Sequence, residues 1–244
     1  MRLYAIEVDP DEAEVVSDRC WQAGAAGIWE QEASGRTVLR VGVEDEAAAA
    51  FVDALTEHRP RDVTDTEVFE LVTRTVSVGP VHDPVTLEVP GTVFGDGLHP
   101  TTATCLDVLA RLVAPGARVL DVGCGSGALS VVAARAGASV TAIDVDPVAV
   151  AATRRNAAAN GVAVDASIAP LSAIPGAFDV VVANISAQAV LELAGDLWRV
   201  LAPGGALVPS GILAGRWHEV RAALGGTAQE VHDVRGWVTA VVTR

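Results

Sequence analysis

Lysine is absent from this sequence: all 17 basic residues are arginine, and they are outnumbered by 31 aspartate and glutamate residues. The formal net charge is −14 at pH 7. A chain this acidic is repelled by the phosphate backbone of nucleic acids and attracted by basic proteins and amines. We therefore expect no direct contact with nucleic acid, and a basic protein as the macromolecular partner.

Cysteines, aromatic residues and long apolar runs are also few. Three cysteines in 244 residues form no disulfide framework and indicate a reducing compartment. The N-terminus becomes acidic at Glu7, unlike a signal peptide, and no apolar run reaches the roughly 18 residues of a membrane-spanning helix. The sequence predicts a cytoplasmic protein without membrane contact. No cluster of His, Cys or carboxylate residues has metal-ligand spacing, so no metal is expected.

The acidic residues are unevenly distributed along the chain. Residues 1–78 contain 17 acids and 7 arginines, whereas residues 79–244 contain 14 acids and 10 arginines. The first segment is predicted to run strand, helix, strand, strand, helix, strand, with the fourth strand at residues 68–78. This is the order of a small α+β ferredoxin-like domain. Residues 79–91 hold three prolines and are predicted to be a linker with one short strand at residues 85–89.

Residues 92–244 alternate strands with helices, which predicts an α/β domain. Its most informative stretch, residues 119–127, reads V-L-D-V-G-C-G-S-G. A buried strand carries Asp121, and Gly123 and Gly125 open a tight turn before a helix, where a ligand can approach the backbone. The next strand ends at Asp144, where a carboxylate can accept both hydroxyls of a ribose. The spacing G-x-G-x-G differs from the dinucleotide fingerprint G-x-G-x-x-G.

This pattern resembles the class I S-adenosylmethionine methyltransferases, whose signature is D-x-G-x-G-x-G followed by an acid after the second strand. The final strand pair around Gly236 resembles their reversed last strand. A nicotinamide-dependent dehydrogenase is the competing interpretation. Asp121 argues against it, because a carboxylate before the turn suits the ammonium of a methionine moiety and would repel a pyrophosphate. The resemblance implies S-adenosyl-L-methionine as cofactor and a Rossmann-like domain with a seven-stranded mixed sheet, here at residues 92–244.

Six motifs make the sequence similar to the bacterial PrmA family, which methylates the eleventh protein of the large ribosomal subunit. In chain order they read F-G-D-G-L-H-P-T-T (94–102), D-V-G-C-G-S-G (121–127), D-V-D-P (144–147), N-G-V (160–162), V-V-A-N-I-S-A (181–187) and S-G-I-L (210–213). Asp96 and Ser186 depart from the family pattern, and the segment before the first motif is shorter than in the family. The resemblance implies that the N-terminal ferredoxin-like domain recognises the substrate.

The resemblance also implies cofactor contacts at Thr102, Gly123, Asp144 and Asn184. Physical arguments agree, since Thr102 lies at a helix start and Asn184 at the carboxyl end of a strand, where open α/β sheets bind their ligands. The full set of predicted cofactor contacts is Phe94, Thr102, Asp121, Gly123, Gly125, Asp144 and Asn184.

The predicted catalytic residues are Asn184, Ile185 and His99. The Asn184 amide oxygen and the Ile185 carbonyl would accept the hydrogens of an amine and direct its lone pair at the methyl group. His99 would assist proton removal, although a histidine in a loop is more often structural. Methyl transfer from a sulfonium otherwise depends on in-line positioning.

Three functions remain open at this stage. The first is N-methylation of lysine ε-amines or an N-terminal α-amine of a ribosomal protein. The second is methylation of a peptide or small-molecule amine in specialised metabolism, which the shortened segment before the first motif motivates. The third is cofactor binding without catalysis, against which the intact Asp121, Gly123, Asp144 and Asn184 argue.

Overall fold

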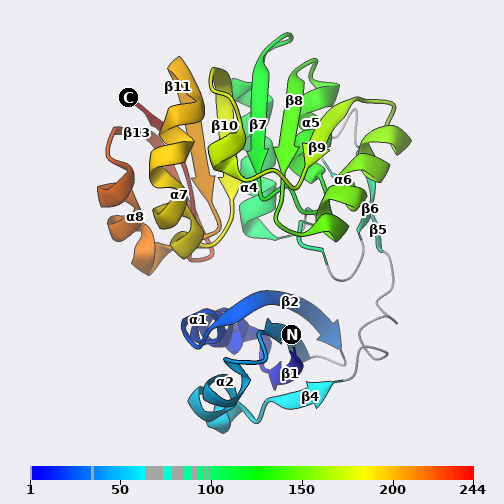
Figure 1. The fold of residues 1–244 in the computed structure, drawn as a ribbon, viewed down its shortest axis with the longest axis vertical. Helices are drawn as coiled ribbons and strands as arrows, with labels where there is room; N and C mark the ends of the chain where they lie inside the picture. Colours follow the sequence, from blue (N-terminus) through cyan, green and yellow to red (C-terminus); the bar gives the residue numbers. More distant parts are fainter. Residues whose placement is uncertain are drawn as a thin grey trace. The chain divides into compact units, whose positions relative to one another are not determined.

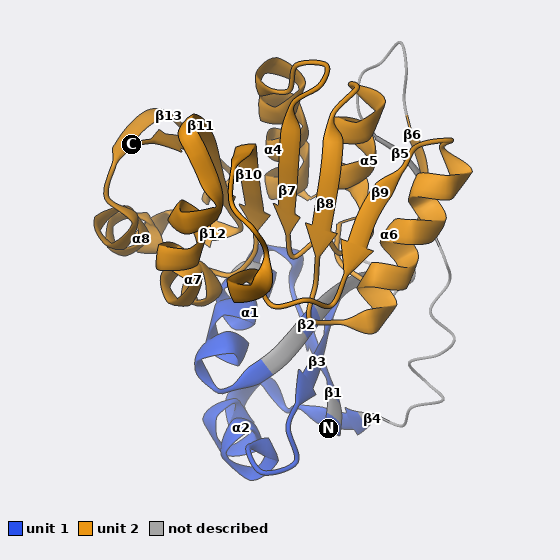
Figure 2. Cartoon of the chain, turned by 45° about the horizontal axis from the view of Figure 1, so that its top comes forward, with its two compact units in different colours: residues 1–72 blue, residues 73–244 orange. Residues whose placement is uncertain are grey.

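The computed structural model describes residues 2–33, 36–63, 74–78, 85–89, 93–95, 97 and 99–244. The chain divides into two compact units, residues 1–72 and residues 73–244, coloured separately in Figure 2. The predicted roles of the two domains, and the boundaries at residues 78 and 91, remain predictions. Among the described helices, none is long and apolar enough to cross a membrane.

The first unit has the predicted ferredoxin-like topology. Its antiparallel sheet has the order β2-β3-β1-β4, and two helices follow the first and third strands. One face of the sheet is apolar, because alternate residues such as Ile6 and Leu39 are fully buried with Phe51 of the second helix. The elements are β1 (Arg2–Val8), α1 (Ala13–Gln22), β2 (Ala25–Ala33), β3 (Arg36–Val43), α2 (Ala48–Ala54) and β4 (Arg61–Val63), with short 3₁₀ turns at Pro10–Glu12 and Thr56–His58.

The predicted fourth strand of this unit is wrong. The strand that pairs with β1 is β4, with Tyr4 opposite Asp62. Residues 74–78 of the expected strand form β5 (Arg74–Val78), which pairs with β6 (Val85–Val89) in a separate two-stranded sheet of the second unit. The rest of the expected strand lies outside the described residues. Both segments suit extended backbone, so only the tertiary pairing separates them.

The second unit is built around one eight-stranded sheet with helices on both faces (Figure 1). Its order is β9-β8-β7-β10-β11-β14-β13. The two-residue β12 pairs with the same edge of β14 as β11 does. The strands are β7 (Arg118–Val122), β8 (Ser139–Ile143), β9 (Val164–Ser167), β10 (Phe178–Asn184), β11 (Leu201–Ser210), β12 (Ile212–Leu213), β13 (Thr227–Val234) and β14 (Trp237–Thr243). The helices are α4 (Pro100–Leu112), α5 (Ala128–Arg135), α6 (Pro147–Ala159), α7 (Ala187–Val200) and α8 (Trp217–Leu224), with 3₁₀ turns at Leu171–Ala173 and Ala214–Arg216.

The predicted seven-stranded mixed sheet is thus present, with β12 as a short addition. Strands β7 to β11 run parallel, and β14 is antiparallel to β11 and β13. Alternate residues of β7 enter two cores: Val119 packs with α4, α5 and α6, and Leu120 with α7 and α8. From the central β7 the chain proceeds to β8 on one side and returns to β10 on the other. The carboxyl ends of β7 and β10 therefore form the switch point where such sheets bind ligands.

Candidate active site

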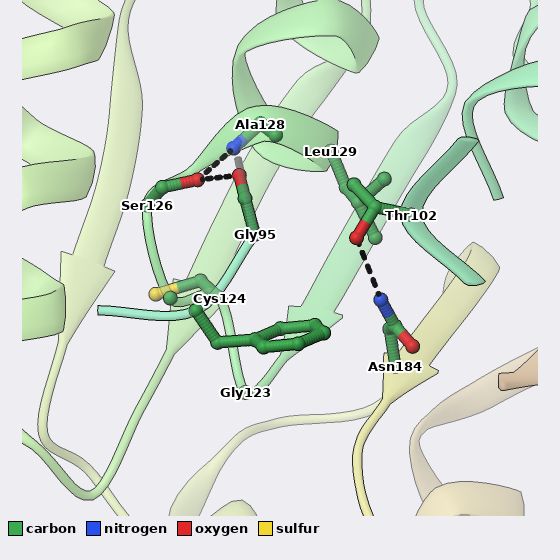
Figure 3. A pocket seen from close by; sticks show the side chains of 10 residues that line it. Gly95, Thr102, Gly123, Cys124, Ser126, Ala128, Leu129 and Asn184 are labelled. Atoms are coloured by element: carbon green, nitrogen blue, oxygen red, sulfur yellow. Dashed lines mark hydrogen bonds between the residues drawn. The ribbon is translucent and has the colours of Figure 1, made fainter. Parts of the chain in front are cut away.

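A small cleft opens at this switch point. Its walls come from the glycine-rich turn after β7, the start of α5, the third residue of α4, the end of β10 and the segment 93–95 (Figure 3). The residues that line it are Phe94, Gly95, Thr102, Gly123, Cys124, Gly125, Ser126, Ala128, Leu129 and Asn184. Five of the predicted site residues line the cleft directly: Phe94, Thr102, Gly123, Gly125 and Asn184.

Glycine is required at two positions of the turn because neighbouring segments pack too closely there to leave room for a side chain. A Cβ built on Gly125 would lie 2.5 Å from the carbonyl oxygen of Phe94, and one on Gly127 would lie 2.9 Å from Thr153. Both residues have positive φ, a conformation that side chains disfavour. The turn therefore fits tightly between segment 93–95 and α6.

Every backbone N–H from Gly123 to Ala128 donates a hydrogen bond within the chain, over 2.8–3.3 Å. The acceptors are Ile143 O for Gly123 and Cys124, Asp144 Oδ2 for Gly125, Phe94 O for Ser126, Cys124 O for Gly127 and Ser126 Oγ for Ala128. A phosphate-binding turn needs free N–H groups directed at the ligand. The turn offers none of these six, which argues against the dehydrogenase interpretation.

Asp121 lies beneath the turn and is 1% exposed. Its Oδ2 accepts a hydrogen bond from Ser130 Oγ over 2.6 Å, while its buried Oδ1 has no partner among the described residues. Burial raises the pKa of this carboxyl to about 6, the charge of Asp144 adds to the rise, and the hydrogen bonds from Ser130 oppose it. A buried carboxylate oxygen without a donor is costly unless a cation or donor from a ligand reaches it.

Asp144 follows β8 at the same edge of the sheet. Its Oδ2 accepts the N–H of Gly125 over 2.9 Å and its Oδ1 accepts the N–H of Asp146 over 3.0 Å. Each carboxylate oxygen can accept a second hydrogen bond. Asp146 is the N-cap of α6 and accepts the N–H of Val148 over 2.7 Å. These backbone bonds fix the orientation of the Asp144 carboxylate.

Two exposed apolar residues that sequence reasoning missed lie beside Asp144. Val145 is 96% exposed, and Ile168 is 63% exposed. They follow the paired ends of β8 and β9, where Ile143 is opposite Ser167. Both side chains are therefore accessible to the apolar part of a ligand bound at this edge of the sheet. The only sequence signal for them is their position directly after a strand end.

Asn184 ends β10, next to β7, with Ala183 opposite Val122. Its Nδ2 donates to Thr102 Oγ1 over 3.4 Å, a long hydrogen bond drawn in Figure 3. Its Oδ1 is buried and has no partner among the described residues. Thr102 is 1% exposed in the first turn of α4. Asn184 thus gives the cleft a buried oxygen without a donor among the described residues, in addition to the Asp121 oxygen beneath the turn.

Ile185 is held between two glycines. A Cβ on Gly123 would lie 2.3 Å from Ile185 Cγ2, and a Cβ on Gly211 would lie 2.4 Å from the Ile185 carbonyl oxygen. The Ile185 N–H donates to Ser210 O over 3.1 Å, and the Ser186 side chain caps α7. These contacts hold the Ile185 backbone in place at the carboxyl end of β10.

His99 is the N-cap of α4, and its Nδ1 lies 2.8 Å from Thr101 Oγ1. Its ring makes edge contacts with Phe94 (centroids 5.3 Å apart) and with Trp237 of β14 (5.0 Å). Phe94 is 47% exposed. A role for His99 in proton removal remains a prediction. Trp237 carried no motif in the sequence, and the fold alone brings it to His99. The neighbouring Asp96 lies outside the described residues.

The other cysteines and charged groups add no second site among the described residues. Cys20, Cys105 and Cys124 are buried free thiols. Burial raises the pKa of the Cys124 thiol, so it is a weak nucleophile, and its small side chain suits the tight turn. In the described part of the chain, no three His, Cys, Asp or Glu side chains form a group that could hold a metal ion.

The reversed last strand, the glycine turn after β7 and the acid after β8 define the second unit as a class I methyltransferase fold. The chain belongs to the family "Ribosomal protein L11 methyltransferase (PrmA)", whose model matches residues 54–244.

Individual relatives agree with this assignment. The chain is 49% identical over 137 residues to the ribosomal protein L11 methyltransferase of Symbiobacterium thermophilum, covering 55% of this chain and 45% of the relative. It is 40% identical over 187 residues to that of Bacillus velezensis, covering 73% and 60%. The crystal structure of a ribosomal protein L11 methylase from Lactobacillus delbrueckii subsp. bulgaricus superposes with a TM-score of 0.59 and 29% identity, covering 62% of this chain and 82% of that one. The chain spans about half the length of the curated relatives it matches.

Proposed function

We propose that this protein transfers a methyl group from S-adenosyl-L-methionine to an amine nitrogen of a protein, with ribosomal protein L11 as the leading acceptor. The names of its relatives support this acceptor. The observation that carries the proposal is a pair of buried oxygens on adjacent strands, Asp121 Oδ1 and Asn184 Oδ1, for which the described residues provide no donor. Asp121 Oδ1 suits a cationic group of the cofactor, and Asn184 Oδ1 suits the N–H of an acceptor amine.

The residues around the cleft fit this cofactor. Asp121 Oδ1 would bind its ammonium group, and the start of α4 with Thr102 would bind its carboxylate. Asp144 has lone pairs left for the ribose hydroxyls. The exposed Val145 and Ile168 would cover the adenine. These assignments place a cation on an anion, hydroxyls on a carboxylate and an aromatic ring on apolar surface.

The bound cofactor supplies an electrophilic methyl group on a sulfonium whose leaving group is a neutral thioether. The acceptor nitrogen forms the new bond with its lone pair, so an ammonium acceptor must first lose a proton. Asn184 Oδ1 and the Ile185 carbonyl would accept the remaining N–H groups and orient the lone pair toward the methyl carbon. Because Ile185 is closely packed against Gly123 and Gly211, this orientation would be preorganised.

His99 is a candidate for the proton step. Its ring lies beside the half-exposed Phe94, which lines the cleft, and its Nδ1 faces Thr101. We include His99 as a proton acceptor that acts before methyl transfer, and we place Trp237 behind it as an orienting contact.

The acidic first unit would recognise the acceptor. Residues 1–72 carry 17 acids against 6 arginines, and long-range attraction of a basic protein would raise its association rate. The three free buried cysteines suit a reducing compartment, and we propose that the protein acts in the cytoplasm.

The direct test is incubation of the protein with methyl-labelled cofactor, purified unmodified L11 and, separately, a whole-cell extract. Mass spectrometry then identifies the labelled nitrogen. Label on L11 amines supports the full proposal. Label only on peptides or small amines retains the chemistry and replaces the acceptor. Binding of S-adenosylhomocysteine without transfer to any acceptor would leave a cofactor-binding protein without catalysis, and absence of binding would falsify the methyltransferase proposal.

A further inference from the structure

Two asparagines, Asn156 of α6 and Asn160 at its C-cap, take the place of a further strand beside β6. In the β5–β6 hairpin, the polar backbone groups of Thr86 and Glu88 point away from β5. Asn160 accepts the Thr86 N–H over 3.1 Å and donates to Thr86 O over 2.7 Å. Asn156 accepts the Glu88 N–H over 2.8 Å and donates to Glu88 O over 2.9 Å. Each side-chain amide therefore pairs as a backbone peptide group would, and closes the free edge of β6.

The two asparagines differ in one contact. Asn156 Nδ2 also donates to Ser126 O in the glycine-rich turn over 2.8 Å, and Asn156 is 1% exposed. The second bond of Asn160 Nδ2 goes instead to Asn156 O, within α6. The Asn156 side chain thus connects β6 to the turn, whereas the Asn160 side chain bonds to β6 and to α6 but makes no bond to the turn.

Ser126 in turn donates hydrogen bonds to segment 93–95, which forms one wall of the cleft. Its N–H donates to Phe94 O over 2.9 Å, and its Oγ donates to Gly95 O over 2.5 Å (Figure 3). Phe94, Gly95 and Ser126 all line the cleft. One buried amide, that of Asn156, therefore bonds to the strand that precedes segment 93–95 and to the residue that holds this segment against the turn.

We propose that Asn156 is a positioning residue for the cofactor cleft: it fixes the Ser126 peptide, and through it the distance between the glycine turn and segment 93–95. The inference rests on the proposed function for its consequence, cofactor binding. Without the amide, Ser126 O loses its buried donor, and the turn can shift relative to Phe94 and Gly95. Asn160 does not act on the turn, although it bonds to the same strand.

The full-length chain with Asn156→Ala is compared with the matched variant Asn160→Ala. Affinity for S-adenosylhomocysteine is measured by calorimetry, and backbone hydrogen exchange is measured separately in β6 and in residues 123–128. Both variants should exchange faster in β6. Only Asn156→Ala should exchange faster in residues 123–128 and bind S-adenosylhomocysteine on the order of tenfold more weakly, because it alone leaves a buried carbonyl of the turn without a donor.

Equal exchange of residues 123–128 in the two variants would overturn the inference, whatever the affinities are. If wild-type protein fails to bind S-adenosylhomocysteine, the proposed function fails, and the exchange comparison still decides the role of Asn156. If Asn156→Ala does not fold, Asn156→Ser replaces it, since its hydroxyl is too short to reach Ser126 O and can bond to its own helix. Unchanged exchange in residues 123–128 of that variant likewise overturns the inference.

Discussion

Gly211 lies so close to Ile185 that no side chain fits between them: a Cβ at position 211 would stand 2.4 Å from the Ile185 carbonyl oxygen and 3.0 Å from its carbonyl carbon. The contact joins the loop after β11 to the residue after β10. The Ile185 carbonyl is one of the two proposed acceptors for the amine, so under this proposal the geometry of methyl transfer would depend on Gly211, which is not itself a proposed contact.

Gly211→Ala should therefore lower turnover. Gly204 provides a matched control, because both glycines have a φ of +79° but a Cβ at Gly204 meets nothing within 4 Å. Each alanine should cost about 1 kcal/mol of stability for the left-handed conformation. Only Gly211→Ala should also displace Ile185 and reduce kcat, on the order of tenfold or more, with cofactor affinity less affected. Steady-state kinetics and thermal unfolding of both variants test this, and equal kcat values would contradict it.

Asp121→Asn should make the protein more stable and a poorer cofactor binder. At pH 7.5 the wild-type chain buries a carboxylate whose Oδ1 lacks a donor, and the neutral amide removes this charge. A pKa raised from 3.8 to about 6 means that the ionised carboxylate destabilises the folded state by roughly 3 kcal/mol above pH 6. Loss of the charge should weaken S-adenosylhomocysteine binding by at least about tenfold. Denaturant unfolding and calorimetry measure the two effects; a variant that is less stable, or that binds as well as wild type, would contradict the role of Asp121.

The pH dependence should separate stability from binding. Because the folded-state pKa of Asp121 is raised, this group contributes its stability at low pH and loses it as the pH rises through about 6. The stability gain of Asp121→Asn over wild type should accordingly be small below about pH 4, reach about half of its maximum near pH 5, and be fully developed above about pH 7.

Over the same interval, wild-type affinity for S-adenosylhomocysteine should rise, since only the ionised carboxylate attracts the ammonium group. The Asp121→Asn variant should show little of this increase. Calorimetric titrations from pH 5 to pH 7.5 measure both, and a parallel pH response of the two proteins would count against Asp121 as the ammonium contact.

Asn184→Ala should lower turnover more than cofactor affinity. It removes the unpaired Oδ1 proposed to accept the amine N–H, together with the 3.4 Å hydrogen bond to Thr102. Ser186→Ala is a neighbouring control that loses the α7 cap, worth about 1 kcal/mol of stability, without touching the cleft. Rates at saturating cofactor test the prediction. Near wild-type turnover for Asn184→Ala would remove this residue from the mechanism.

A chain of residues 73–244 should fold and bind S-adenosylhomocysteine but methylate a protein acceptor poorly. It keeps β5, whereas a chain of residues 79–244 loses β5 and leaves β6 without its partner strand. The shorter chain should therefore unfold at a lower temperature. Full-length activity on a protein acceptor should also fall as salt shortens the screening length to about 8 Å and below. Equal protein methylation by 73–244 and the full chain, or a flat salt response, would leave the first unit without a role in recognition.

The sequence by itself determined the elements that depend on local order. The run from Asp121 to Gly127 predicted a strand, a tight turn and a helix, because glycine and a helix start act over a few residues. The site role of Asp144 was predicted from its position after the next strand, since the carboxyl ends of parallel strands meet at one edge of the sheet. The family resemblance and the two-unit order came from such local motifs in sequence.

Only the tertiary structure decided which residues meet across the fold. The strand that completes the first sheet is β4 rather than residues 68–78, because strand pairing is set by long-range packing and not by the propensity of either segment. The same holds for the contact of Trp237 with His99 and for the bond between Asn156 and Ser126, which join residues 138 and 30 positions apart. The raised pKa of Asp121 and the unpaired oxygen of Asn184 also depend on burial, a property that neighbours distant in the chain create and that no spacing in the sequence encodes.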